Sequence, residues 1–112
     1  MACGGASPTM HVGGMQGFFT LDYLGRSVLR IHVYVEDDGL EPLSDVLVDA
    51  SIWVPDGGPV QRSRYTKPSG NARFHWGSRT NGTWTLCVDD LTLDGYLYVP
   101  DDNVVTCMDW YN

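Results

Sequence analysis

Histidine and cysteine are the residues of this sequence best suited to acid–base or nucleophilic chemistry, and there are three of each. Nucleophilic catalysis needs a nucleophile and a base held at a fixed geometry, and no Gly-x-Ser-x-Gly or comparable motif occurs. His32 and His75 fall on outward positions of two expected strands, and Arg30 and Arg73 accompany them. A solvated polar face explains this grouping more simply than a catalytic site does. We therefore expect no enzyme activity.

The spacing of the cysteines points to a disulfide rather than to a metal site. No two of them are separated as in a zinc knuckle or a redox Cys-x-x-Cys motif. Cys87 faces outward from an expected strand at 83–89, because the large apolar residues there take the alternate positions. Cys107, in an expected strand at 104–110, shares its face with Asp109. We predict a cross-strand disulfide that stabilises the fold by about 3 kcal/mol, and two unpaired thiols are the alternative.

Cys3 is left without a partner by this pairing. The simplest interpretation is a thiol in a flexible leader, residues 1–9. The alternative is that Cys3 is the lipid-bearing first residue of a small surface lipoprotein whose signal has been removed, which the tract Ala2-Cys3-Gly4-Gly5 permits. The gene upstream of Met1 would decide between them.

Aspartate dominates the charge of the chain. Twelve of the fourteen acidic residues are Asp, and the net charge is −7, which makes nucleic acid and anionic membranes poor partners. Calcium takes about six to eight oxygen ligands, and the cluster Asp101, Asp102 and Asn103 supplies the leading candidates. No Asp-x-Asp-x-Asp-Gly loop with a closing Glu occurs, so turn carboxylates that only promote solubility are the alternative. We expect no other cofactor.

Aromatic residues suggest a candidate binding face. Trp53 alternates with inward residues and therefore points outward together with Leu47, and Tyr96 and Tyr98 lie in the loop-like stretch 91–103. Exposed aromatic side chains commonly anchor proteins and sugars. The alternative is that Trp53 packs under a neighbouring loop or against another domain.

Short runs rich in Val, Ile, Thr, Tyr and Trp must position all these residues. Their period-2 alternation between Gly- and Pro-containing turns predicts strands. The expected strands lie at about 10–20, 26–36, 46–54, 60–66, 72–77, 83–89 and 104–110. No apolar run approaches the roughly 20 residues that span a bilayer. The sequence predicts a single all-β domain, residues 10–112, folded as an antiparallel β-sandwich of about seven strands.

Several segments, in this order, carry a resemblance to a known family: His11-Val12-Gly13, the alternating run 26–36, and the segments 41–48, 66–74, 82–88 and 95–98. Together they resemble a bacterial immunoglobulin-like, fibronectin type III-like module of secreted multidomain proteins, which often lies C-terminal to extracellular peptidases. Members of this family often carry a cysteine pair flanking one turn. The corresponding positions here are Arg64 and Ala72, so that disulfide does not carry over.

The resemblance implies an immunoglobulin-like fold without catalytic residues. It also implies a secreted or cell-surface location, where a disulfide persists, and a role in protein–protein contact, adhesion or spacing. The partner would be a protein or a glycan at the cell surface. One alternative is a carbohydrate-binding module that uses the exposed aromatic residues. Another is the lipoprotein anchored through Cys3.

Overall fold

Alternation along the second strand shows how this sequence builds its fold. In β2 (Ser27–Asp37) every second side chain from Leu29 onward is buried, including Ile31 and Val33, and the residues between them face outward. Val and Ile favour such a strand because their branched side chains pack well on a pleated surface. The alternation expected for 26–36 is therefore confirmed.

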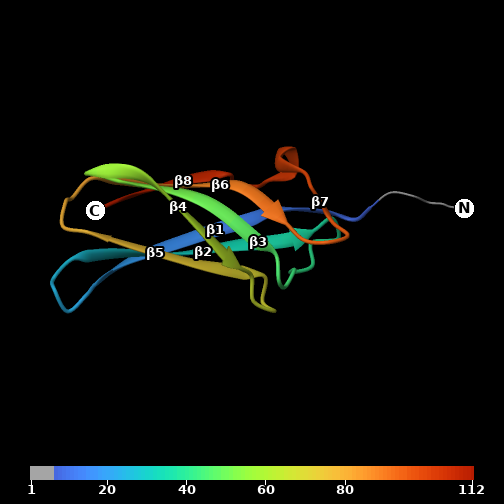
Figure 1. Cartoon of the computed structure of the whole chain (residues 1–112), viewed down its shortest axis with the longest axis horizontal. Coiled ribbons are helices and arrows are strands. Elements are labelled where there is room, and N and C mark those ends of the chain that lie inside the picture. The colour runs from blue at the N-terminus through green and yellow to red at the C-terminus, as the bar shows by residue number, and fades with distance from the viewer. Residues whose placement is uncertain (1–6) are drawn as a thin grey trace, which may run out of the picture.

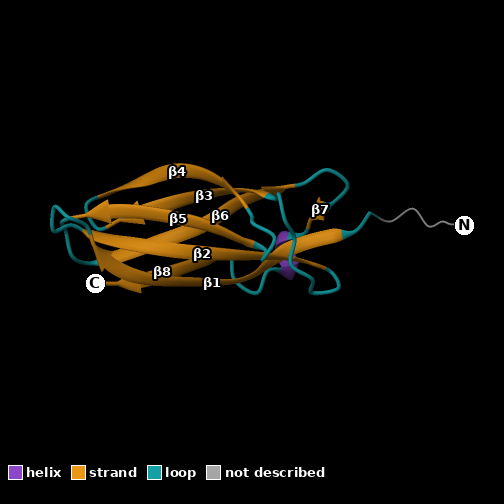
Figure 2. Ribbon diagram, turned by 90° about the horizontal axis from the view of Figure 1, so that it is seen from below, coloured by secondary structure: helices purple, strands orange, loops and turns teal. Residues whose placement is uncertain are grey.

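Two four-stranded sheets make up the structure, a computed structural model that describes residues 7–112. The other elements are β1 (Thr9–Leu21), β3 (Leu47–Val54), β4 (Gly57–Tyr65), β5 (Asn71–Ser78), β6 (Thr83–Thr92), β7 (Leu97–Tyr98), the 3-10 turn η1 (Pro100–Asp102) and β8 (Cys107–Tyr111). Sheet A has the order β5-β2-β1-β7 and sheet B the order β4-β3-β6-β8. The sheets pack face to face, with strands along the long axis (Figures 1 and 2). The predicted β-sandwich is confirmed, and within these residues no helix is long and apolar enough to cross a bilayer.

The structure has eight strands where the sequence predicts about seven. The additional strand, β7, lies in the stretch 91–103 and pairs with the start of β1, so that Met10 lies opposite Tyr98. This pairing is parallel, whereas the other strand pairs are antiparallel. Thr9, which the sequence placed in the leader, already belongs to β1. Residues 1–6, which include the candidate lipid-bearing Cys3, lie outside the described residues.

The last strand starts later than expected. The sequence predicts a strand over 104–110, but β8 begins only at Cys107. The reason is that the preceding residues are still bound to sheet A: the Asn103 side chain accepts from the Val12 amide, and the Val104 amide donates to the Val12 carbonyl. The chain crosses to sheet B after these bonds, and Val104 is left 73% exposed.

The core lies between the inner faces of the two sheets. Its largest fully buried side chains include Trp84 of β6 and Phe74 of β5, which come from opposite sheets. Phe19 of β1 packs edge-to-face on Trp84, with the ring centroids 5.4 Å apart. Leu86 and Val88 are also buried, as alternation predicted. Each large apolar side chain buried in this way contributes about 1.5–3 kcal/mol to folding.

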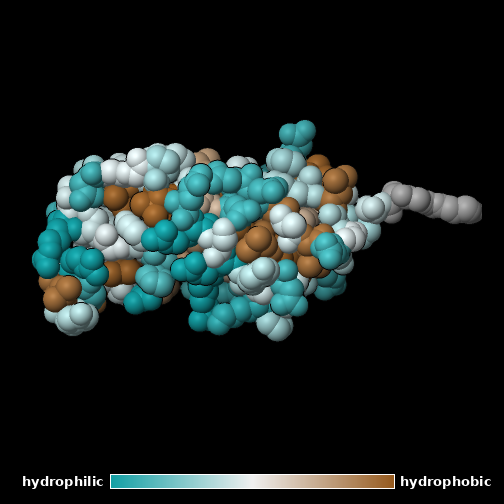
Figure 3. All heavy atoms as spheres, in the orientation of Figure 1, coloured by the Kyte–Doolittle hydropathy of each residue, from teal (hydrophilic) through white to brown (hydrophobic). Residues whose placement is uncertain are grey.

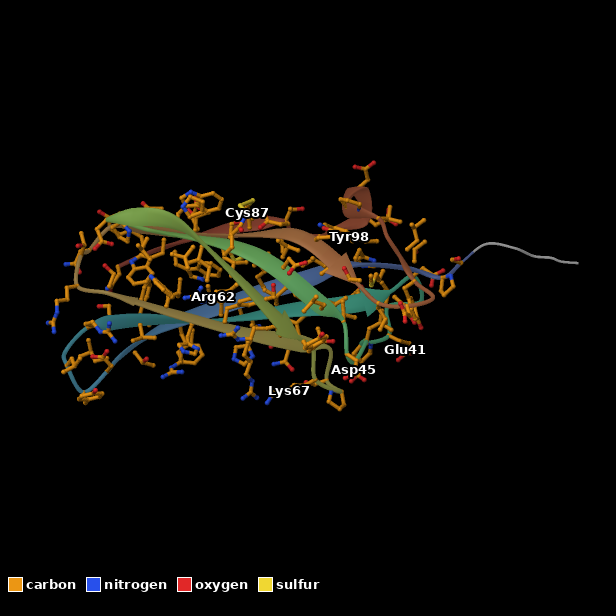
Figure 4. The ribbon with its side chains drawn as sticks, in the orientation of Figure 1. Glu41, Asp45, Arg62, Lys67, Cys87 and Tyr98 are labelled. Carbon is orange, nitrogen blue, oxygen red and sulfur yellow. A yellow bond between two sulfur atoms is a disulfide. The ribbon has the colours of Figure 1, made fainter. Side chains whose placement is uncertain are left out.

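A disulfide and a tryptophan hold β8 in place on one long side of the sandwich. Cys87 of β6 lies directly opposite Cys107, with an S–S distance of 2.08 Å, so the predicted disulfide is confirmed (Figure 4). On the other face of β8, Trp110 reaches β1 at Gly17. A Cβ atom added to Gly17 would lie 2.6 Å from the Trp110 ring. The glycine therefore leaves the space that the indole fills between the sheets.

Thiol mapping tests the disulfide. Without reductant, neither Cys87 nor Cys107 should react with an alkylating reagent in the denatured chain, and both should react after reduction. Because the bond joins positions 20 residues apart, reduction should lower the free energy of unfolding by about 3 kcal/mol. Two reactive thiols at these positions before reduction would contradict the pairing.

A pair of alanine variants tests the contact between the sheets. Gly17→Ala should lower the free energy of unfolding by about 1–3 kcal/mol, because the added methyl group overlaps the Trp110 ring. Gly14→Ala is the matched control, since a Cβ atom there meets nothing within 4 Å. Urea unfolding measures both. Equal losses of stability in the two variants would show that Trp110 does not pack on Gly17.

Candidate functional site: a cationic and aromatic face of sheet A

The outer face of sheet A gathers arginine and histidine side chains in two neighbouring rows. Arg30 of β2 lies directly opposite His75 of β5, and His32 lies opposite Arg73. Residues opposite one another in paired strands are about 5 Å apart, and successive outward residues along one strand are about 7 Å apart. The structure therefore confirms that these four residues share one face of one sheet.

The first strand adds an exposed aromatic side chain to this face. Phe18 lies opposite Arg30 and is 50% exposed. The Phe18 and His32 ring centroids are 6.5 Å apart, and those of His32 and Tyr34 are 6.3 Å apart. The interplanar angles are 25° and 21°, so three rings of similar orientation cross the face. We call the following set the cationic face: Phe18, Arg30, His32, Tyr34, Arg73 and His75.

Sequence reasoning missed Phe18. The run at 10–20 alternates weakly because glycine interrupts it at positions 13, 14 and 17, and the register shifts between Val12 and Gly14. Only the pairing with β2 shows that Phe18 lies beside Arg30. Phe18 could have been placed beside Arg30 only if the pairing register of these two strands were known, and the sequence does not give that register.

Neighbouring side chains fix the orientation of two groups on the cationic face. The side-chain amide of Asn71 donates to Nδ1 of His32 at 2.8 Å, and its carbonyl oxygen accepts from the Ser69 hydroxyl. Because Nδ1 is the acceptor, the ring proton of His32 is on Nε2. The Nε atom of Arg30 donates to Oγ1 of Thr20 at 3.2 Å. This bond leaves the two terminal nitrogens of Arg30 for a ligand.

Two shallow hollows adjoin each other here and share His75. The first, of about 260 Å³, lies on the cationic face. The second, of about 370 Å³, lies at the open side of the sandwich beside β4 and β5, and we call it the edge hollow. It is lined by Arg26, Arg62, Arg64, His75, Trp76 and Gly77. Figure 3 shows a band of hydrophilic side chains across the side of the molecule where β4 and β5 lie.

Two arginines of β4 face inward at the free edge of sheet B. Arg62 and Arg64 lie opposite the core residues Ala50 and Val48, which places them on the inner side of the strand. The guanidinium carbon of Arg62 lies 4.5 Å from the centre of the Trp76 ring, over the open side of the core (Figure 4). Inward charges on an edge strand discourage pairing with another chain. Arg62 therefore has a structural role that explains its position without a ligand.

Most of the arginines in this region lack an acidic partner. Five of the six arginines of the chain line the two hollows. Of these, within residues 7–112, only Arg26 lies within 4.0 Å of a carboxylate, with its Nε atom 2.7 Å from Asp22. Hydrogen bonds from the Arg26 backbone, and then from its side chain and the Leu24 amide, hold the pKa of Asp22 below its usual value. The unpaired guanidinium groups create a local positive potential on a chain of net charge −7.

The structure does not assemble the aromatic surface expected around Trp53. Trp53 points outward from sheet B and is 37% exposed, but Leu47 lies at the opposite end of β3. Tyr96 and Tyr98 are partly buried and pack against the core rather than facing solvent. The sequence pattern could not reveal the burial of these two tyrosines, because their burial depends on how the stretch 91–103 folds back onto β1.

The candidate calcium ligands lie at η1, in a loop that is fastened to sheet A. Asp101 and Asp102 are exposed. The side-chain oxygen Oδ1 of Asn103 accepts from the Val12 backbone amide at 2.7 Å, and its side-chain nitrogen Nδ2 donates to the Tyr98 hydroxyl at 2.8 Å. In the described part of the chain, no group of three or more His, Cys, Asp or Glu residues is placed to hold a metal ion. Calcium binding stays a prediction, and Asn103 has a structural role that the sequence did not reveal.

Two alanine variants test whether Arg62 stabilises the fold more than its neighbour Arg64 does. Arg62→Ala should lower the free energy of unfolding by about 1 kcal/mol, because it removes the cation and its apolar stem from the Trp76 ring. Arg64→Ala, which removes the same side chain two residues away, should have a smaller effect. Urea unfolding of both variants measures the difference. A larger loss for Arg64→Ala would contradict the assigned role of Arg62.

Comparisons with known proteins leave the family of this chain undecided. No protein-family model, no curated protein and no solved structure matches it. The immunoglobulin-like, fibronectin type III-like assignment remains an expectation from the sequence, and the function has to be argued from the geometry of the cationic face.

Proposed function

We propose that this chain is a non-catalytic, immunoglobulin-like and fibronectin type III-like module of a secreted or cell-surface protein, which contacts a partner through the cationic face. The strand order supports the fold assignment. The first, second and fifth strands share one sheet, and the third, sixth and last share the other, as in immunoglobulin-type sandwiches. The Cys87–Cys107 bond supports an oxidising compartment.

The direction of the chain through the sandwich suits a role in contact and spacing. β1 begins beside Asp38, where the Thr9 carbonyl accepts from the Asp38 amide, and β8 ends beside Gly82, where Asn112 exchanges two backbone hydrogen bonds with it. These two places lie at opposite poles of the molecule (Figure 1). When a chain enters a module at one pole and leaves it at the other, the module can hold two neighbouring domains apart. The outer faces of its two sheets then stay free for contact.

The observation that carries the proposal is a pair of arginines on the cationic face that lack an acidic partner within residues 7–112. Arg30 and Arg73 lie in adjacent rows, and within residues 7–112 neither has a carboxylate within 4.0 Å. Like charges directly opposite one another in a sheet destabilise the fold, and we expect a weaker repulsion between these two arginines, which are diagonal neighbours. A chain with fourteen acidic residues could readily place one beside them. Features that oppose stability in this way are expected at functional sites, where a partner supplies the missing charge.

The stability of a double variant tests this reasoning without knowledge of the partner. Arg30→Gln combined with Arg73→Gln should leave the free energy of unfolding unchanged or raise it by about 0.5 kcal/mol, because repulsion is relieved. Arg79→Gln is the control for the general effect of losing a cation from an acidic chain, since Arg79 is exposed in the turn after β5. Thermal and urea unfolding in low salt provide the measurement.

The opposite result would remove the basis of the proposal. If the double variant loses about 1 kcal/mol or more relative to Arg79→Gln, the two arginines stabilise the fold, and their grouping needs no partner.

A further inference from the structure

We infer that the cationic face binds a short acidic saccharide, one or a few sugar units that carry carboxylate or sulfate groups, an inference that rests on the proposed contact role of this face. The ligand would lie over β1, β2 and β5 and extend at His75 toward the edge hollow. Four properties of the site lead to this ligand: its charges, its rings and hydrogen-bond donors, the paired backbone of its central strand β2, and its size.

Guanidinium groups provide the recognition of charge. The terminal nitrogens of Arg30 are left for a ligand because its Nε atom is bound to Thr20. Arg73 is exposed one row away, on the neighbouring strand. The planar fork of an arginine matches the two oxygens of a carboxylate or a sulfate, and such charge-assisted pairs are the stronger hydrogen bonds. Two arginines on adjacent rows can therefore hold two charged groups, or one from both sides.

The other side chains of the cationic face suit a ligand ring that has both a polar and an apolar side. Phe18 presents a half-exposed aromatic ring beside Arg30. His32 carries its ring proton on Nε2, because Nδ1 is occupied by Asn71, and this N–H can donate to a hydroxyl group. The Tyr34 hydroxyl lies 3.4 Å from the side-chain oxygen of Gln16. A simple inorganic anion would use only the arginines, whereas a sugar also uses an aromatic surface and further polar groups.

The backbone of this face disfavours an acidic peptide as the ligand. β2 is paired on both sides, with β1 and β5, and β1 with β2 and, at its start, β7. The backbone groups of β2 are used within the sheet, whereas β5 and the part of β1 that carries Phe18 have one unpaired side in residues 7–112, so a peptide strand could pair only at those edges and not over the middle of the face. Recognition must come from side chains that project from it. Such projecting side chains favour a ligand that is recognised by its own substituents, as a saccharide is.

The size and charge of the surroundings limit the length of the ligand. The two hollows measure about 260 and 370 Å³, just below and just above the lower limit of about 300 Å³ for small-molecule sites. Screening limits the reach of each charge to about 8 Å at physiological salt. A long polyanion would run beyond the cationic face onto the rest of the surface, and it would be repelled there because the chain as a whole has a net charge of −7. A ligand of a few units meets the arginines and avoids that repulsion.

Calorimetric titration of the full chain tests the inference with defined probes. The two acidic arms are a sulfated tetrasaccharide prepared from heparin and a carboxylated tetrasaccharide prepared from hyaluronan. The negative probes are neutral maltotetraose and a hexaglutamate peptide. We expect at least one acidic arm to bind at least tenfold more tightly than both negative probes, and binding by one arm alone identifies the charged group.

Matched variants locate the binding. Arg30→Gln with Arg73→Gln should weaken binding of the acidic probe at least tenfold, and Phe18→Ala at least threefold. Arg79→Gln, which removes one positive charge outside the face, should weaken it less than twofold. Circular dichroism confirms that each variant is folded.

Any of three results would overturn the inference. These are no detectable binding of either acidic arm, binding of maltotetraose or hexaglutamate as tight as that of the acidic arms, and an Arg79→Gln loss equal to that of the double variant. If this happens while the double variant keeps its stability, the contact role stands and only the class of ligand is wrong. If the double variant is also destabilised, both proposals fail.

Discussion

Burial of the inner side of β2 is the constraint on which the rest of the structure depends. β2 is the strand that pairs with both β1 and β5, and its inner residues Leu29, Ile31 and Val33 are almost completely buried. A slip of one residue would expose these side chains and bury charged ones, at a cost of about 1.5–3 kcal/mol for each apolar side chain exposed. The same register places Arg30 and His32 on the outside. The fold and the cationic face are therefore set by one alternating segment.

The sequence predicted the features that depend on strong alternation. The outward position of Arg30 and His32 and the pairing of Cys87 with Cys107 follow from period 2 in strands whose apolar residues are clear. It could not predict features that depend on how weakly patterned segments fold back. Phe18 lies in a strand interrupted by glycines, and Tyr98 lies in a stretch without a period, so only the pairing with neighbouring strands shows where their side chains go.

The two long sides of the sandwich differ in how they are closed. On one side, the Cys87–Cys107 bond and Trp110 fasten β8 to its neighbours by covalent linkage and packing. On the other side, Arg62 covers Trp76 with a charged group that can remain hydrated. Positive charge is therefore concentrated beside β5, where it discourages strand addition and adjoins the cationic face. An acidic chain with one such region directs anionic ligands to a defined place and repels them elsewhere.

An amide NMR titration of the full chain with the acidic tetrasaccharides tests most directly whether the outer face of sheet A is the binding face. The account predicts that shift changes concentrate at Phe18, Arg30, His32, Arg73 and His75, with nearly unchanged signals from Trp53 and Thr85 on the outer face of sheet B. It also predicts that the changes diminish as salt is added, because the contacts are ionic. Changes centred on sheet B, or spread evenly over both sheets, would contradict it.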